Sequence, residues 1–213
     1  MMIAAMMVAA VSANAQFEAG TFSIQPKAGF NASWLTNADA NVGGVNLSKS
    51  PYIGALLGVE AEYQLAPKFS LAAGANYTLQ GTAWGDLDYM GTKREDSKIE
   101  LGYVTVPVTA NYYIFEGFAV KTGVQFGFMT NAKEKYTIKT SVTGTETKTE
   151  FDTDLKDGCK KFDLSIPIGV SYQFKVPIVL DLRYNLGLTK INKDGDSMKN
   201  NVIQLTVGYK FAL

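Results

Sequence analysis

The chain of 213 residues contains no histidine and only one cysteine, Cys159. Histidine is the commonest general base and the commonest metal ligand of proteins, so both roles lose their usual residue. A single cysteine cannot form a disulfide within the chain. Neither sign of charge is in excess, with 20 basic and 20 acidic residues, which argues against a nucleic-acid partner. We therefore expect no cofactor, no metal site and no nucleic-acid binding.

Long apolar runs are also missing after the N-terminus, so the rest of the chain offers no segment for a transmembrane helix, which needs about 20 apolar residues. The N-terminal residues 1–16 read MMIAAMMVAAVSANAQ, an apolar stretch that ends in the small residues Ala13 and Ala15. This spacing suits cleavage before Gln16. The pattern predicts a signal peptide over residues 1–15 and one domain over residues 16–213. The alternative is a short buried helix, since the usual basic residues are absent.

Eight stretches of the sequence alternate between apolar and polar residues. In IVLDLRYNLGL, residues 178–188, leucine and tyrosine alternate with Asp181, Arg183 and Asn185. Successive side chains of a strand point to opposite faces, so this period of two indicates a strand whose faces lie in different media. The eight stretches span residues 22–34, 52–65, 69–80, 101–115, 118–130, 162–174, 178–189 and 202–211.

The connections between these stretches alternate in length. Short turns occur around Pro67, at Glu116-Gly117 and over residues 175–177, whereas the other connections are long and polar. All long loops then lie at one end of the molecule and both termini at the other. This arrangement is typical of an up-and-down barrel with extracellular loops. We predict an all-β fold, an eight-stranded antiparallel up-and-down transmembrane β-barrel in the outer membrane of a Gram-negative bacterium.

A soluble barrel of the lipocalin type has the same alternation with its two faces exchanged. Three features favour the membrane barrel. The polar face is rich in glycine, which suits a crowded interior. The ending VIQLTVGYKF is similar to the terminal-strand signal of the barrel-insertion machinery, which we expect as a partner together with outer-membrane lipid. The apolar face carries no charge and has aromatic residues near its ends: Phe22, Trp34, Phe69, Tyr77, Phe118, Phe128, Phe162 and Phe174.

Charged residues on the polar face would point into the lumen of such a barrel. Eight strands enclose little more than their own side chains, so these charges must pair. Arg183 can hold two carboxylates with its planar guanidinium group and is the expected centre of the network. A plugged lumen is the favoured interpretation, and an ion path through a narrow porin is the alternative. The predicted lumen charge network comprises Lys27, Glu60, Glu62, Lys121, Asp163, Asp181, Arg183 and Lys210.

Several motifs resemble the outer-membrane β-barrel family of Bacteroides-type bacteria, known as porin-family or PorT-like proteins. They are LGYVTVPVTANYYIF (101–115), GVQFGF (123–128), KKFDLSIPIGVSYQF (160–174), RYNLGLTKI (183–191) and the GYKF ending. The resemblance covers essentially the whole mature chain. It implies the barrel fold without an activity, and the founding name implies a part in a secretion system. Small outer-membrane enzymes resemble one another in using a histidine, so we expect no catalytic residue here.

The longest loop, residues 131–161, alternates on both sides of a turn at Thr143-Gly144. This pattern predicts a β-ribbon that continues the fifth and sixth strands beyond the membrane, with an edge on which a protein partner could pair. WGDLDY (84–89) and KDGDS (193–197) are interpreted as turns rather than calcium sites. We expect a structural or surface-interaction role without catalysis, with an adhesion module or a secretion-system accessory acting through the loops as the alternative.

Overall fold

The structure is a computed structural model that describes residues 18–39, 41–42, 44–89, 92–142 and 145–213. The predicted signal peptide, residues 1–15, lies outside these residues and stays a prediction. The described chain is almost entirely β-structure, with one short 3-10 helix, η2 (Lys156–Gly158). No helix in the described ranges is long and apolar enough to cross a membrane.

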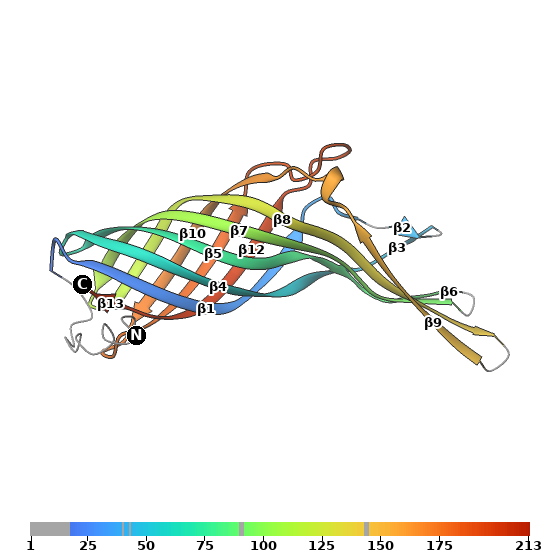
Figure 1. Cartoon of the computed structure of the whole chain (residues 1–213), viewed down its shortest axis with the longest axis horizontal. Coiled ribbons are helices and arrows are strands. Elements are labelled where there is room, and N and C mark those ends of the chain that lie inside the picture. Colours follow the sequence, from blue (N-terminus) through green and yellow to red (C-terminus); the bar gives the residue numbers. More distant parts are fainter. Residues whose placement is uncertain (1–17, 40, 43, 90–91, 143–144) are drawn as a thin grey trace, which may run out of the picture.

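Eight strands form a closed antiparallel ring (Figure 1). Each strand pairs with the next one along the chain, and the last pairs with the first, so the ring has no open edge. The predicted eight-stranded up-and-down barrel is confirmed. The strands of the ring are β1 (Phe22–Leu35), β4 (Lys49–Ala66), β5 (Phe69–Trp84), β7 (Thr92–Phe115), β8 (Phe118–Val142), β10 (Phe162–Gln173), β11 (Ile178–Gly187) and β12 (Asn200–Tyr209).

The two ends of the barrel differ as the connection lengths predict. Tight turns join β4 to β5, β7 to β8 and β10 to β11, and Gly117 adopts a φ of 79° in the second of them, which glycine permits at little cost. The C-terminus lies at this end, where β13 (Phe211–Ala212) pairs with β1 (Figure 1). The opposite end carries the longer connections and the short strands β2 (Asn41–Val42), β3 (Val45–Asn46), β6 (Leu87–Tyr89) and β9 (Thr145–Asp154).

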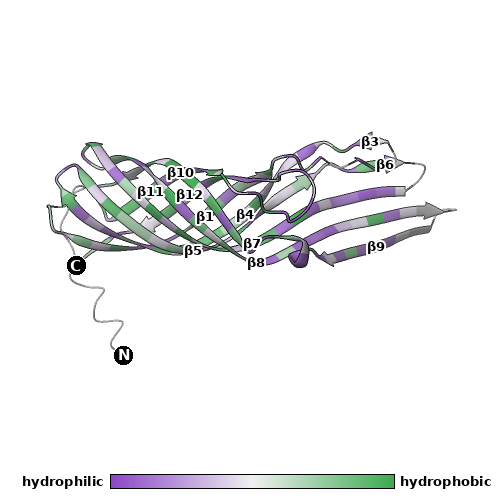
Figure 2. Ribbon diagram, turned by 90° about the horizontal axis from the view of Figure 1, so that it is seen from above, coloured by the Kyte–Doolittle hydropathy of each residue, from purple (hydrophilic) through white to green (hydrophobic). Residues whose placement is uncertain are grey.

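The apolar residues of the ring face outward and the polar residues face the lumen. Leu182 is 47% exposed, whereas Asp181 and Arg183 on either side of it are each 3% exposed. Phe30 and Leu57 are more exposed still, at 68% and 66%. Figure 2 shows apolar residues along the closed part of the barrel and hydrophilic residues at the far end. This orientation is the opposite of a soluble lipocalin-like barrel.

Beyond the barrel, β7 and β8 continue much further than predicted, together with β6 and β9. β8 pairs with β9 on one side, as at Tyr136 and Phe151, and with β7 on the other, as at Ile138 and Arg94. The result is a four-stranded sheet, β6-β7-β8-β9, here called the protruding sheet (Figure 1).

The ribbon predicted over residues 131–161 is present, because β8 pairs with β9 from Lys133–Asp154 to Val142–Thr145. Two details were wrong. The ribbon continues β8, the fifth strand, but β9 ends at Asp154 and does not continue into β10, the sixth strand, and the free edges belong to β6 and β9. Residues 87–89 of WGDLDY form strand β6 instead of a turn. The cause is the sequence TKREDSKIE at residues 92–100, where polar residues occupy both faces. A strand with water on both sides shows no alternation of hydropathy, so it cannot be recognised from a period of two in the sequence.

The prolines inside the strands coincide with an interruption of the hydrogen-bonded ladder. Pro167 faces the lumen, and the β10–β8 pairing is interrupted between Ser165–Gln125 and Ile168–Thr122, the segment that contains this proline. Proline has no N–H group to donate, so the gap lies where the donor is missing. Opposite this gap, a Cβ atom on Gly123 would collide with the Val108 carbonyl oxygen, so only glycine fits there.

Candidate functional site

The centre of the lumen holds five charged side chains joined by ion pairs. Glu60 on β4 lies at their midpoint, with Lys27 Nζ at 2.6 Å from Oε2 and Lys121 Nζ at 3.0 Å from Oε1. Lys121 Nζ also contacts Asp181 Oδ2 at 2.8 Å. Arg183 Nη2 contacts Glu60 Oε2 at 3.2 Å and Asp181 Oδ2 at 3.0 Å. All five side chains are at most 4% exposed, and we call them the central cluster.

Strand register and glycine together bring these long side chains to one level. Gly169 on β10 pairs with Lys121 on one side and with Arg183 on the other. Lys27 on β1 likewise lies between Gly58 and Gly208. Paired residues share a face, so each glycine leaves room in the lumen beside a lysine or an arginine. This explains why the inner face is rich in glycine.

The central cluster has three cations and two carboxylates, so it carries a net charge of +1 by simple count. Arg183 contacts both carboxylates, as the shape of its guanidinium group suggested. Glu60 has more partners, since it contacts all three cations. Glu60 rather than Arg183 is therefore the most connected member of the cluster.

The other three charges of the predicted network lie elsewhere. Lys210 Nζ pairs with Glu62 Oε2 at 2.7 Å, and Glu62 Oε1 also accepts hydrogen bonds of 2.6 Å from Ser70 and Tyr113. Asp163 is outside both groups, and its carboxylate accepts a 2.6 Å hydrogen bond from the Thr189 hydroxyl.

Including Asp163 in one network with Arg183 was wrong for a geometric reason. On β10, the residue level with Arg183 is Gly169. Asp163 precedes Gly169 by six positions, which is roughly 20 Å along a strand. A shared face of the barrel is therefore not enough to bring two charges into contact.

Uncharged amides and hydroxyls line the lumen on the loop side of the central cluster. Several of their buried atoms have no hydrogen-bond partner among the described residues, including both side-chain atoms of Asn185, Oε1 of Gln125 and Nε2 of Gln204. Buried amides that lack a protein partner usually bind ordered water. This layer is therefore the part of the lumen best suited to hold water.

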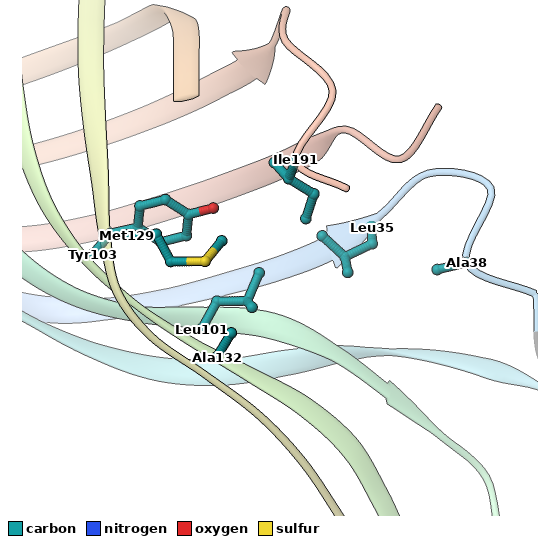
Figure 3. Packing of buried hydrophobic residues seen from close by; sticks show 7 residues of the cluster. All are labelled: Leu35, Ala38, Leu101, Tyr103, Met129, Ala132 and Ile191. Carbon is teal, nitrogen blue, oxygen red and sulfur yellow. The ribbon is translucent and has the colours of Figure 1, made fainter. Parts of the chain in front are cut away.

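An apolar layer follows at the loop end and was not predicted from the sequence. Its members point inward toward one another (Figure 3): Leu35, Ala38, Leu101, Tyr103, Met129, Ala132 and Ile191. Along β7 the inward-facing side chains change from the polar Thr105 to Tyr103 and Leu101. The outward-facing apolar side chains of the same strand include valines at even-numbered positions, so the apolar residues move from even to odd positions. This move of the apolar residues from one face to the other is the feature of the sequence that could have predicted the apolar layer. Once the outside of the barrel is in water, the inside can be apolar.

Metal binding and the reactivity of the cysteine are questions separate from the lumen charges. No group of three or more cysteine, aspartate or glutamate side chains in the described ranges could hold a metal ion. Cys159 is half-buried in the connection between β9 and β10, and burial raises the pKa of its thiol above the ordinary value. A raised pKa lowers the fraction of reactive thiolate at neutral pH.

Comparison with solved structures finds other outer-membrane barrels. Ail, the attachment invasion locus protein of Yersinia pestis, is 16% identical, with 91% of this chain and 99% of that chain covered and a TM-score of 0.46. OprG from Pseudomonas aeruginosa is 16% identical over 93% and 99% of the two chains, with a TM-score of 0.43. Neisserial surface protein A is 14% identical over 89% and 97%, with a TM-score of 0.42. Similarity at this level says nothing about ligands.

Among curated proteins, no match to this sequence is found. The profile of one protein family, described as "outer membrane protein beta-barrel domain", matches residues 14–193. The match covers every strand of the ring except the last, β12, and includes every member of the central cluster. The chain therefore belongs to the outer membrane protein beta-barrel domain family and is located in the outer membrane of a Gram-negative bacterium.

Proposed function

We propose that this protein is a closed, non-conducting and non-catalytic barrel that serves the outer membrane structurally or through its extracellular surface. The central cluster carries the proposal, because five buried charges joined by ion pairs occupy the middle of a narrow lumen. The apolar layer at the loop end supplies a second closure above it. A permeating ion would have to displace both.

The protruding sheet is the part of the protein best placed to meet a partner. It extends from a rigid barrel, and its outer strands β6 and β9 each have one unpaired edge among the described residues. β9 is ten residues long and could add an extended partner strand. Charged residues on β9, such as Lys148, Glu150 and Asp152, disfavour pairing of this edge with a second copy of the same strand. An adhesion role and a secretion-system role of the PorT-like kind both require this surface.

The first prediction concerns conductance. Purified full-length protein in a planar lipid bilayer should give no steady, selective single-channel current, because the lumen is closed at two levels. The matched variant replaces Lys27 and Glu60 by alanine, which removes one ion pair while keeping the net charge of the cluster. This variant should conduct no more than the wild type, since the apolar layer is still present. Steady currents from the wild type would overturn the closed-lumen proposal and leave a narrow porin as the better account.

The second prediction concerns the protruding sheet. Deleting residues 140–148 should leave the barrel folded, because the backbone of this segment pairs mainly with itself and with Thr92. Folding is measured by the faster gel migration of unheated protein, since a closed barrel resists detergent. Deleting the same number of residues from β8 inside the ring, 120–128, is the control and should abolish that fast-migrating form. Loss of folding in the first variant would show that the barrel depends on the tip of the sheet.

A further inference from the structure

Six lysines gather at the loop end of the barrel, on the connections from β9 to β10 and from β11 to β12. We call this set the lysine rim: Lys156, Lys160, Lys161, Lys190, Lys193 and Lys199. Residues 156–161 and 189–199 contain these six lysines and only three aspartates. The protruding sheet has the opposite balance, with seven basic and ten acidic residues over 86–100 and 131–154. Although the whole chain has no net charge, the lysine rim is basic and the protruding sheet is acidic.

Backbone contacts hold the two connections side by side (Figure 1). Lys160 N donates to Ile191 O at 2.7 Å, and Lys193 N donates to Gly158 O at 3.0 Å. Cys159 and Asn192 form an isolated β-bridge between them. Lysines that are about 30 residues apart in sequence therefore share one rim.

The rim lysines differ from those of the protruding sheet in their partners. Within the described ranges, none of the six forms an ion pair with a carboxylate, although Lys190 and Lys193 each donate to a backbone carbonyl. On the protruding sheet, five of the six lysines form ion pairs with carboxylates, and Lys98 is the exception within the described ranges: Lys93, Lys133, Lys135, Lys139 and Lys148. The six rim lysines outnumber the three aspartates of the same connections, and within the described ranges no carboxylate pairs directly with any of them.

The rim lies at the edge of the apolar outer band. Lys161 directly precedes Phe162, which faces outward and is 45% exposed. Lys190 comes two residues after Leu188, which is 39% exposed. With about 3.3 Å per residue in an extended chain, these two lysines begin roughly 3–7 Å beyond the outward-facing Phe162 and Leu188, a distance that suits the headgroup region if those residues border the hydrocarbon. A lysine side chain is long enough to direct its ammonium group along the membrane surface.

We propose that the lysine rim binds the phosphate groups of lipids in the surrounding outer leaflet. The charge is complementary, the depth is that of the headgroup, and the neighbouring Phe162 and Leu188 offer apolar surface to the acyl chain of the same lipid. Lipid phosphates at the rim would fix the depth and tilt of the barrel. The acidic protruding sheet would then stand away from the anionic surface. Lipid binding at the rim would occur whether or not the lumen conducts.

Lipid selectivity tests the proposal. The full-length protein, folded in a neutral detergent, is titrated with phosphatidic acid or with phosphatidylcholine of the same acyl chains, and bound lipid is counted by native mass spectrometry. The wild type should prefer phosphatidic acid. Replacing Lys160, Lys161 and Lys190 by glutamine should weaken phosphatidic acid binding about a hundredfold at low salt, since each lysine near an anionic surface contributes about fivefold. Phosphatidylcholine binding should change by much less, because the choline cation of this lipid compensates the charge of its phosphate.

The control variant removes the same number of charges from the protruding sheet by replacing Lys133, Lys135 and Lys139 with glutamine. These lysines already have carboxylate partners, so phosphatidic acid binding should change by less than about threefold. Both variants must keep the heat-modifiable gel migration of the wild type. An unchanged lipid preference in the rim variant, or an equal loss in the control, would overturn the proposal. Competition by inorganic phosphate at the same concentration would also overturn it, because a soluble anion would then suffice.

Discussion

Replacing Glu60 by glutamine should lower the free energy of unfolding of the barrel by about 3–5 kcal/mol, because it removes one member of a buried ion-pair network. Glutamine keeps the shape of the side chain and removes its charge. Lys27 would lose the one carboxylate that it contacts among the described residues, and Asp181, which contacts Lys121 and Arg183, would be the single carboxylate left in a cluster of three cations. The measurement is urea unfolding in lipid vesicles, followed by tryptophan fluorescence.

Arg183→Met is the matched comparison, since it removes a charge from the same cluster and retains much of the side-chain volume. The variant keeps Lys27 and Lys121 with Glu60 and Asp181, so two cations remain with two carboxylates. We expect it to destabilise the barrel less than Glu60→Gln does. The opposite order would mean that Arg183 organises the cluster and that the contacts of Glu60 contribute little.

The distinction between these two residues shows what the sequence could and could not predict. Alternation identifies which residues face the lumen, because it follows from the geometry of a single strand. It does not identify which residues lie at the same level, because this depends on the register between strands. Asp163 and Arg183 share the inner face, but the pairing of Gly169 with Arg183 places them far apart. Lys27 and Glu60 are close for the same reason, through the pairing of β1 with β4.

Alternation of hydropathy also reveals a strand only where the two faces of that strand lie in different media. In the membrane-spanning part of the ring this condition holds, and the eight strands were recognised. In the protruding sheet both faces meet water, so residues 92–100 were mistaken for a loop. At Leu101 and Tyr103 the inner face becomes apolar while the outside becomes polar, so the alternation changes phase. The missed features all lie beyond the edge of the apolar band.

Replacing Leu182 by arginine should lower the free energy of unfolding by about 2–4 kcal/mol, because its side chain points outward near the middle of β11. An arginine there must enter hydrocarbon or distort the bilayer around it. The same substitution at Leu188, at the edge of the band and beside the lysine rim, should cost only about 0–1 kcal/mol. Unfolding in vesicles of one lipid measures both values. Because the two positions carry the same residue at similar exposure, the difference between the variants isolates depth in the membrane. Equal costs at both positions would contradict a lipid-facing band, since a surface in water offers no depth for the charge to sense.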